Sequence, residues 1–261
     1  MTTEITEKRG IASESFHWYK RDGSPCHEVE NKSKPGEMRA TTLRDAKKLD
    51  LVPSTTSVLQ ILAKPALNVW KMEQVLMSAL TIPRIVLESD KAFVTRILLD
   101  ADEQAHKASE KGVGIHGSIE KYLDGKSIEE MYVPYVIPVI NEFEKRGWLN
   151  NRKVEHSFAH PNGFGGKVDY HNDKVLLDIK SKDFENLEKE TIKKLIYDEQ
   201  LYQIASYRFG LQMPHLQCFE VYVSRTLPGL FHIHQWDESD LNKGEIIFLR
   251  TLDLFKLIKG I

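Results

Sequence analysis

Cysteine is scarce in this sequence, and its scarcity excludes several kinds of site. The 261 residues include two cysteines, Cys26 and Cys218, which are far apart and form no CxxC pair. An iron–sulfur cluster or an all-cysteine zinc site needs more thiolates than this, and a zinc site would have to recruit histidines. We therefore expect two reduced thiols and no iron–sulfur cluster.

Long apolar runs and excess positive charge are also missing. No hydrophobic stretch approaches the roughly 20 residues that cross a bilayer, and the start, MTTEITEKRG, has acidic residues and no hydrophobic segment. We expect an intracellular, cytoplasmic protein with no membrane partner. A net charge of −2 argues against coating a polyanion through bulk charge, so such a contact needs a local patch. No G-x-x-x-x-G-K-[ST] phosphate loop is present, so we expect no ATP.

The remaining composition is that of a soluble globular protein, with 41% hydrophobic and 28% charged residues. The length suits a single domain over residues 1–261. Within it, residues 1–50 are polar and irregular and predict an N-terminal arm or short strands, 51–100 a helical region, and 101–261 the core. The order of predicted helices and strands indicates an α/β fold, with a central mixed β-sheet flanked by helices.

The most informative stretch runs from Gly165 to Lys182, GGKVDYHNDKVLLDIKSK. It predicts a tight β-hairpin centred on Asn172 and Asp173, with Tyr170 opposite Val175 and Asp169 opposite Leu176. Because side chains alternate along a strand, Asp178 and Lys180 share one face, and Asp169 points to the same face as a diagonal neighbour. We expect this face at an edge of the sheet.

Two carboxylates held this close repel unless a cation lies between them. Mg²⁺ prefers oxygen ligands, commonly takes one or two carboxylates from the protein, and completes its shell with water and substrate phosphate. Lys180 could then stabilise negative charge on a phosphate or hold the attacking water. The alternative is an ordinary solvated hairpin face with a salt bridge, and the hairpin alone does not decide between the two.

A helix before the hairpin carries a second polar pair. His116 and Glu120 lie four residues apart, on one helix face. Three nearby glycines lower helix propensity by up to ~1 kcal/mol each relative to alanine, which suggests a close approach to the backbone there. These glycines are Gly112, Gly114 and Gly117. A lone helical histidine is more often a packing or surface residue, but a neighbouring carboxylate pair favours a metal ligand.

Two further helices carry polar groups with more than one interpretation. Ser54 or Thr55 can cap a helix that Pro65 ends or kinks, and a helix start of this kind can also hold a phosphate. A long helix over 185–211 places Gln203 and Tyr207 one turn apart, either as ordinary surface residues or as part of a site. The other expected elements are helices over 135–148 and 237–258 and strands over 153–160, 216–224 and 230–235.

Together these pieces resemble the PD-(D/E)XK nuclease superfamily, and specifically its RecB-like exonuclease branch, over roughly residues 51–224. Gly112, His116 and Glu120 match a G-x-x-x-H-x-x-x-E helix. Asp169, Asp178 and Lys180 match the Asp and D/E-x-K hairpin, and Gln203 with Tyr207 match the Q-x-x-x-Y helix. The segment VPSTTSVLQIL is similar to a Pro-Ser helix start in phage and mitochondrial genome-maintenance exonucleases. Val168 stands where the superfamily name expects proline, and Val113 where threonine often follows the glycine.

The resemblance implies a restriction-endonuclease-like core with an N-terminal extension, and a role for each matching residue. The implied metal ligands are His116, Asp169, Asp178 and the backbone carbonyl of Ile179, for one or two Mg²⁺ or Mn²⁺ ions. Lys180 would position the nucleophile or stabilise the pentavalent phosphate, and Glu120 would hold a metal-bound water. Gln203 and Tyr207 would orient Lys180 or touch DNA, and Ser54 and Thr55 would grip a backbone phosphate within a DNA-contacting region over 51–100.

These roles predict a metal-dependent DNA exonuclease acting on free or single-stranded ends, in recombination, repair or phage DNA processing. DNA is the expected partner, with a single-strand annealing or binding protein as a further candidate. Two alternatives stay open: a structure- or sequence-specific endonuclease on the same core, and a non-catalytic DNA-binding subunit. The endonuclease would need a recognition region, and none is obvious. The non-catalytic subunit would normally have lost a ligand, and every expected ligand is present.

Overall fold

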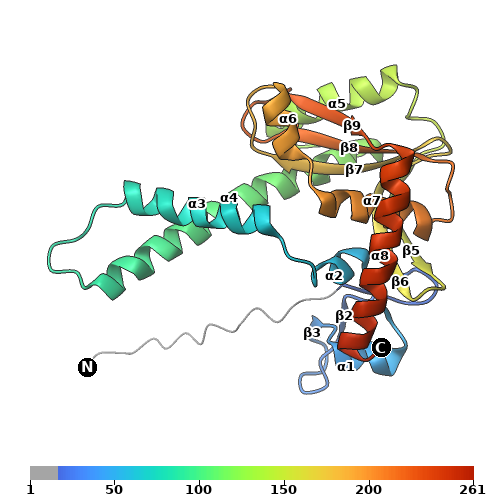
Figure 1. The fold of residues 1–261 in the computed structure, drawn as a ribbon, viewed down its shortest axis with the longest axis horizontal. Coiled ribbons are helices and arrows are strands. Elements are labelled where there is room, and N and C mark those ends of the chain that lie inside the picture. The colour runs from blue at the N-terminus through green and yellow to red at the C-terminus, as the bar shows by residue number, and fades with distance from the viewer. Residues whose placement is uncertain (1–16) are drawn as a thin grey trace.

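The computed structural model describes residues 17–261, so residues 1–16 of the expected N-terminal arm lie outside the described part. At its centre is a five-stranded sheet in the order β5-β6-β7-β8-β9 (Figure 1). The strands are β5 Lys153–His160, β6 Phe164–His171, β7 Val175–Lys182, β8 Gln217–Ser224 and β9 Phe231–Gln235. Strands β7 and β8 are parallel and the other neighbours antiparallel, so the sheet is mixed, as predicted.

Helices cover both faces of this sheet, which confirms the predicted fold class (Figure 1). The covering helices are α4 Asp90–Leu123 and α5 Val133–Lys145 on one face, and α7 Asp198–Gly210 and α8 Glu238–Lys259 on the other. Successive side chains of β7 point alternately to the two helical layers, as expected for a strand covered on both faces. Val175, Leu177 and Ile179 pack in the cluster with α4 and α5, and Leu176 in the cluster with α7 and α8.

The hairpin register differs from the prediction by two residues. Tyr170 pairs with Leu177 and His171 with Leu176, so the expected pairing of Tyr170 with Val175 is wrong. The Asn172 side chain explains the longer turn, because its Oδ1 accepts from the backbone N–H groups of Lys174 and Val175, both at 2.8 Å. A shift of two residues keeps every side chain on its predicted face.

Two expected placements along the hairpin and the following helix are also wrong. Strand β7 is the central strand and not at an edge. The expected single helix over 185–211 is two helices, α6 Lys189–Leu195 and α7. Lys182 Nζ donates to the Leu195 carbonyl at 2.6 Å, and the Gln200 side chain accepts from the Tyr197 N–H at 2.8 Å. These bonds satisfy the end of one helix and the start of the next.

Short strands and helices precede the sheet, and some of them pack onto β6. The strands are β1 Trp18–Tyr19, β2 Glu28–Glu30, β3 Met38–Ala40 and β4 Val52–Pro53, and the helices are α1 Leu43–Leu49 and α2 Thr55–Leu59. Strands β1 and β4 form one antiparallel pair, and β2 and β3 another. A bridge between Ser54 and Gly165 joins this region to β6. Gly165 allows the close contact, because an added Cβ would lie 2.7 Å from the Phe158 carbonyl oxygen.

Helix α3 (Pro65–Thr81) and the first half of α4 form a pair that extends away from the sheet (Figure 1). Pro65 begins α3, and α2 ends earlier at Leu59, so the expectation that Pro65 ends the first helix is wrong. Proline suits this position because its missing N–H has no helical partner there. A short 3-10 helix, Glu130–Tyr132, precedes α5.

Large hydrophobic side chains are exposed on this helical pair and on the segment that connects its two helices, among them Met72, Leu80 and Leu87. Arg96, on α4, makes an ion pair with Glu88. The DNA-contacting role of residues 51–100 therefore stays a prediction. In the part of the chain that the structure describes, no helix combines the length and apolar character of a bilayer span.

Candidate active site

Asp178 and Lys180 meet on the face of β7 that is covered by α7. Lys180 Nζ lies 2.5 Å from Asp178 Oδ2, and the Asp178 side chain is only 1% exposed. The structure therefore places the two residues side by side, as strand alternation predicts. The Lys180 side chain is 28% exposed, whereas the Asp178 carboxylate beside it is buried.

Asp169, on β6, connects this pair to helix α4. Its Oδ2 accepts from the backbone N–H of Ile179 at 2.7 Å and lies 3.0 Å from His116 Nε2. Three elements thus bring together Asp169, His116 and the strand that carries Asp178 and Lys180. The backbone of Ile179 lies beside Asp169, where its carbonyl is also expected to act as a ligand.

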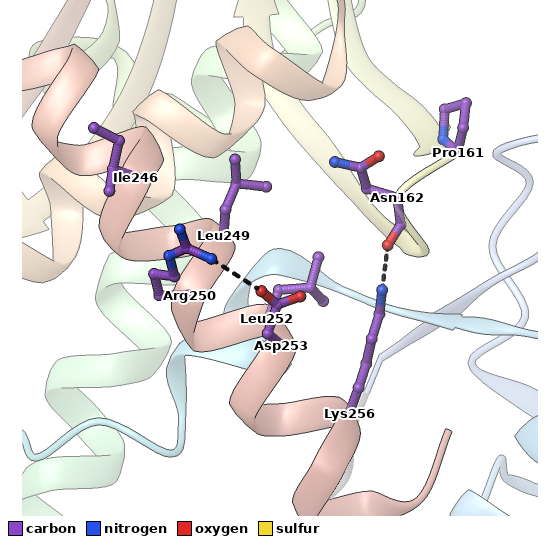
Figure 2. A pocket seen from close by; sticks show the side chains of 8 residues that line it. All are labelled: Pro161, Asn162, Ile246, Leu249, Arg250, Leu252, Asp253 and Lys256. Atoms are coloured by element: carbon purple, nitrogen blue, oxygen red, sulfur yellow. Dashed lines mark hydrogen bonds and ion pairs between the residues drawn. The ribbon is translucent and has the colours of Figure 1, made fainter.

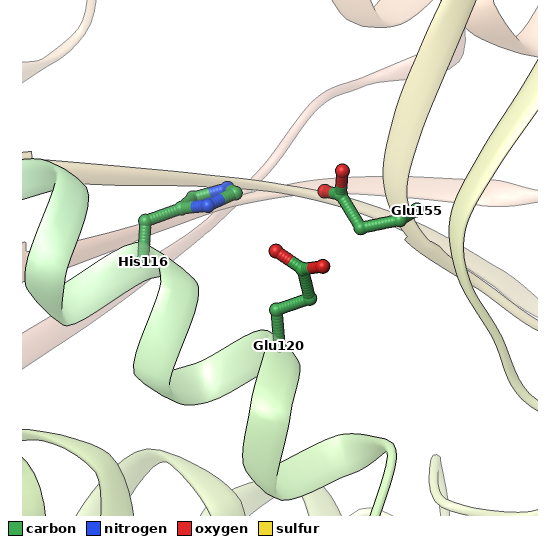
Figure 3. A group of neighbouring side chains, drawn as sticks. All are labelled: His116, Glu120 and Glu155. Carbon is green, nitrogen blue, oxygen red and sulfur yellow. The ribbon is translucent and has the colours of Figure 1, made fainter. Parts of the chain in front are cut away.

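Glu120 lies one turn after His116 on α4, and a residue that the sequence analysis missed joins them. His116, Glu120 and Glu155 each offer a ligand atom within 4.8 Å of the other two, and Figure 3 shows the three side chains converging. Glu155 comes from β5, between the pairs Val154–Tyr170 and His156–Val168, so it lies in register with Asp169. Only the strand pairing reveals this proximity, and no motif in the sequence signals it.

Gln203, on α7, contacts both members of the Asp178–Lys180 pair. Its Nε2 donates to Asp178 Oδ1 and to the Tyr207 hydroxyl, each at 3.0 Å, and its Oε1 accepts from Lys180 Nζ at 3.4 Å. Tyr207 is 4% exposed and packs its ring edge against Phe158. Tyr207 therefore holds Gln203 by a hydrogen bond from a buried position. Of the two residues, Gln203 is the one that contacts Lys180 and can orient it.

Glu220 is a second residue that the sequence analysis missed. It pairs with Asp178 across the parallel strands and is completely buried. No N–H or hydroxyl donor of the described residues reaches its carboxyl oxygens. Burial and the neighbouring Asp178 raise the pKa of Glu220 well above its usual range. The sequence did contain one signal for Glu220, because it is a charged residue within the mostly apolar segment CFEVYVS.

The ionisable groups of the site shift one another in opposite directions. Burial and the nearby Asp169 raise the pKa of Asp178, although Lys180 opposes them. Burial acts to raise the pKa of Asp169 as well, but the hydrogen bond and charge of His116 lower it overall. Burial disfavours the ammonium of Lys180, yet Asp178, Glu220 and Asp169 raise its pKa. The positive charges of Lys180 and His116 thus offset the repulsion between the carboxyl groups of the site.

Other groups closely approach the backbone of α4 at two of its three glycines. A Cβ on Gly112 would lie 2.5 Å from Ser181 Oγ, and one on Gly114 would clash with the Tyr132 ring. These two permit the close approach that the sequence suggests. Gly117 has no heavy atom within 4 Å of its hypothetical Cβ, so the expectation of close approach is wrong there.

Ser54 and Thr55 lie at the start of α2, where both are buried. Ser54 caps the helix by accepting from the Ser57 N–H at 3.0 Å, as predicted for one of the two. The Thr55 hydroxyl donates to the Gly165 carbonyl at 3.4 Å and accepts from Ser206 on α7 at 3.0 Å. These hydroxyl groups link α2 to β6 and α7. The expectation that they bind a DNA backbone phosphate stays a prediction.

The donor set fits a divalent cation of the Mg²⁺ or Mn²⁺ class. Carboxylates from Asp169 and Asp178 suit either ion, and the imidazole of His116 is a ligand that Mn²⁺ accepts readily. Burial and the nearby Asp169 raise the pKa of Asp178, and a bound cation would relieve this electrostatic situation. The chemistry of these donors therefore suits the metal that the sequence predicts, although the group whose ligand atoms converge within 4.8 Å among the described residues is His116, Glu120 and Glu155.

A groove of about 510 Å³ lies away from this group, between α8 and the turn after β5 (Figure 2). Its lining residues are Pro161, Asn162, Ile246, Leu249, Arg250, Leu252, Asp253 and Lys256. None of these belongs to the carboxylate, imidazole and lysine group, so the groove is not part of the candidate site.

Comparison with known proteins gives two similar solved structures. One is a putative exonuclease from Eubacterium rectale, with a TM-score of 0.42 and 12% identity over 57% of this chain and 68% of that one. Another is an alkaline exonuclease from Laribacter hongkongensis, with a TM-score of 0.36 and 14% identity over 79% of this chain and 92% of that one. No family model and no curated protein matches the sequence.

Proposed function

We propose that the chain is a metal-dependent deoxyribonuclease of the PD-(D/E)XK type that digests DNA from free ends. One observation carries the proposal: Lys180 contacts Asp178 at 2.5 Å, His116 contacts Asp169 at 3.0 Å, and the backbone N–H of Ile179, between Asp178 and Lys180, donates to Asp169 at 2.7 Å. A solvated hairpin face would not require a histidine from a distant helix or a carboxylate that is 1% exposed. The arrangement favours the catalytic interpretation over the structural one.

The metal would be held by the side chains of Asp169 and Asp178 and by the carbonyl of Ile179, with His116 beside them. When bound, a Mg²⁺ or Mn²⁺ ion would polarise the phosphodiester and lower the pKa of a water molecule. These protein ligands would leave the ion free to bind water and a phosphate oxygen of the substrate as well. Neither an iron–sulfur cluster nor ATP is needed for this chemistry.

Lys180 and Gln203 would prepare the site for an in-line attack by water. Gln203 bonds both Asp178 and Lys180, so it limits the rotation of the ammonium group. An ammonium held beside Asp178 can stabilise the charge that develops on the phosphate, or orient the water that attacks it. Glu120, which has no side-chain hydrogen bond or ion pair among the described residues, would hold a further water molecule.

The preferred substrate would be linear DNA, or single-stranded DNA with a free end, in recombination, repair or phage DNA processing. A single-strand annealing or binding protein would be the matching partner. Digestion of 5′- and 3′-labelled oligonucleotides, with Mg²⁺, with Mn²⁺ and with EDTA, tests the activity. We expect shortening from an end only in the presence of metal. Covalently closed circular DNA should stay intact, and its cleavage would favour the endonuclease instead.

A further inference from the structure

Helix α3 is apolar on two opposite sides. Its inner side packs on α4, where the buried Ser78 hydroxyl donates to Asp100 Oδ2 at 2.8 Å. Successive residues of a helix are about 100° apart, so Leu76 and Leu80 point away from Ser78, and they are 62% and 81% exposed. The outer stripe to which they belong consists of Val69, Met72, Leu76 and Leu80. Apolar residues on every side are typical of a helix that is covered on every side.

The charges of α3 also fit a covered helix. Its charged residues are Lys71 and Glu73, one of each sign, within 17 residues. The helix therefore lacks the charged face that a solvent-exposed amphipathic helix presents. Because the two charges are opposite, a second copy of the same helix would meet no net repulsion.

The segment between α3 and α4 presents further apolar side chains on a fixed backbone. Its exposed side chains are Ile85, Val86 and Leu87. Arg96 on α4 fixes the segment, because it donates to the Pro83 carbonyl at 3.0 Å and to both carboxyl oxygens of Glu88 at 2.8 Å. Leu87, which is fully exposed, has a left-handed φ of 65°, a conformation that costs about 1–3 kcal/mol. The segment is thus already ordered for binding, which lowers the entropic cost of an interface.

The exposed apolar area of this helical pair is close to that of a stable interface. Besides the outer stripe and the connecting segment, it includes Leu67, Met77, Val94, Leu98 and Leu99. At about 100 Å² for each fully exposed aliphatic side chain, the exposed fractions together give roughly 700 Å². A stable interface buries about 800 Å² on each partner. Interfaces between identical chains are more apolar than transient ones, and a closed two-fold pair is their commonest form.

We propose that the pair formed by α3 and the first half of α4 binds the same pair of a second copy, so that the protein is a two-fold dimer. The outer stripes of the two copies pack against each other, and four helices surround one apolar core, as in a four-helix bundle. Along α4, the rise from Leu98 to His116 is about 27 Å, so the interface lies away from the candidate active site. The dimer therefore does not depend on the proposed nuclease function.

Sedimentation equilibrium of the full chain at micromolar concentrations tests the proposal. The wild type should have the mass of two chains. The double variant Met72→Glu with Leu76→Glu places like charges at the centre of the interface, so it should sediment as single chains. Ile246→Glu with Leu257→Glu, which replaces equally exposed apolar residues of α8, is the matched control and should stay a dimer. Circular dichroism melting confirms that each variant is folded.

A wild type with the mass of one chain, or of more than two, would overturn the proposal. So would a dimer that persists in the folded Met72→Glu, Leu76→Glu variant, or one that dissociates in the α8 control. If a monomeric wild type bound single-stranded DNA or another protein through the outer stripe, the surface would belong to that partner instead. DNA digestion judges the proposed function separately, and its failure would leave the dimer unaffected.

Discussion

Asp178 on β7 and Glu220 on β8 lie in register across the parallel pair at the centre of the sheet, and both side chains are buried. Burying two carboxyl groups together is unfavourable unless one is neutral or a cation is near. Here Lys180 is the nearby cation, because it contacts Asp178, and burial beside Asp178 raises the pKa of Glu220 well above its usual range. Such an arrangement is costly for stability alone, and it is typical of sites that perform chemistry.

Substituting Asp169 should weaken metal binding, whereas substituting Lys180 should abolish cleavage and leave metal binding intact. Asp169→Ala removes a carboxylate ligand, so Mn²⁺ affinity should fall at least tenfold. Lys180→Ala removes no ligand, so Mn²⁺ affinity should survive while cleavage is lost. Calorimetric titration with Mn²⁺ measures the first quantity and an oligonucleotide assay the second. Equal Mn²⁺ affinity in wild type and Asp169→Ala would contradict the ligand assignment.

Gln203 should act by positioning Lys180 and Asp178. Gln203→Leu keeps the side-chain size but removes the hydrogen bonds to both, so kcat should fall about 10–100-fold. KM for DNA should change little if Gln203 does not touch the substrate. Gln217→Leu, at an exposed position of β8, is the control and should cleave normally. A rise in KM with unchanged kcat would instead indicate direct contact with DNA.

Lys182 should make stability depend on pH. Burial lowers the pKa of Lys182 to about 7, and its ammonium lies 3.5 Å from the ring centre of Tyr197 and 5.4 Å from that of Tyr222. The other charged neighbours are Glu220 and Glu199, which oppose the shift, and Lys180 and Arg225, which add to it. Between pH 7 and the unfolded pKa the unfolded chain binds more protons at Lys182 than the folded chain, so this residue makes stability rise with pH.

Replacing Lys182 with methionine removes that dependence. From pH 7 to pH 9 the wild type should gain on the order of 2 kcal/mol of unfolding free energy relative to Lys182→Met. Urea denaturation of both proteins at the two pH values measures the difference. Lys174→Met, in the exposed hairpin turn, should follow the wild type. An identical pH slope for wild type and Lys182→Met would refute the burial argument.

Two glycine substitutions should change stability in opposite directions. Gly117→Ala lies within α4 with open space around its Cβ, so it should stabilise by up to ~1 kcal/mol through helix propensity. Gly165→Ala would press a methyl group against the Phe158 carbonyl and Tyr19, and should destabilise by about 1–3 kcal/mol. Thermal melting in EDTA, which removes metal effects, measures both. A destabilised Gly117→Ala would mean that another group approaches α4.

The sequence predicted the parts of the site that depend on local periodicity. Strand alternation placed Asp178 beside Lys180, and helical spacing placed His116 and Glu120 on one face. Glu155 and Glu220 were missed because their positions depend on long-range register, which a single sequence does not reveal. The break between α6 and α7 was missed for a similar reason, since the Lys182 bond to Leu195 crosses 13 residues.

The most direct test compares cleavage of end-labelled linear DNA by the wild type, Asp178→Ala and Asp173→Ala in Mg²⁺. Asp173 lies on the same hairpin but is exposed at the turn, so its loss removes a carboxylate without touching the site. We predict that the wild type and Asp173→Ala shorten the DNA at similar rates and that Asp178→Ala leaves it intact. Full cleavage by folded Asp178→Ala, or none by the wild type in either Mg²⁺ or Mn²⁺, would contradict the account.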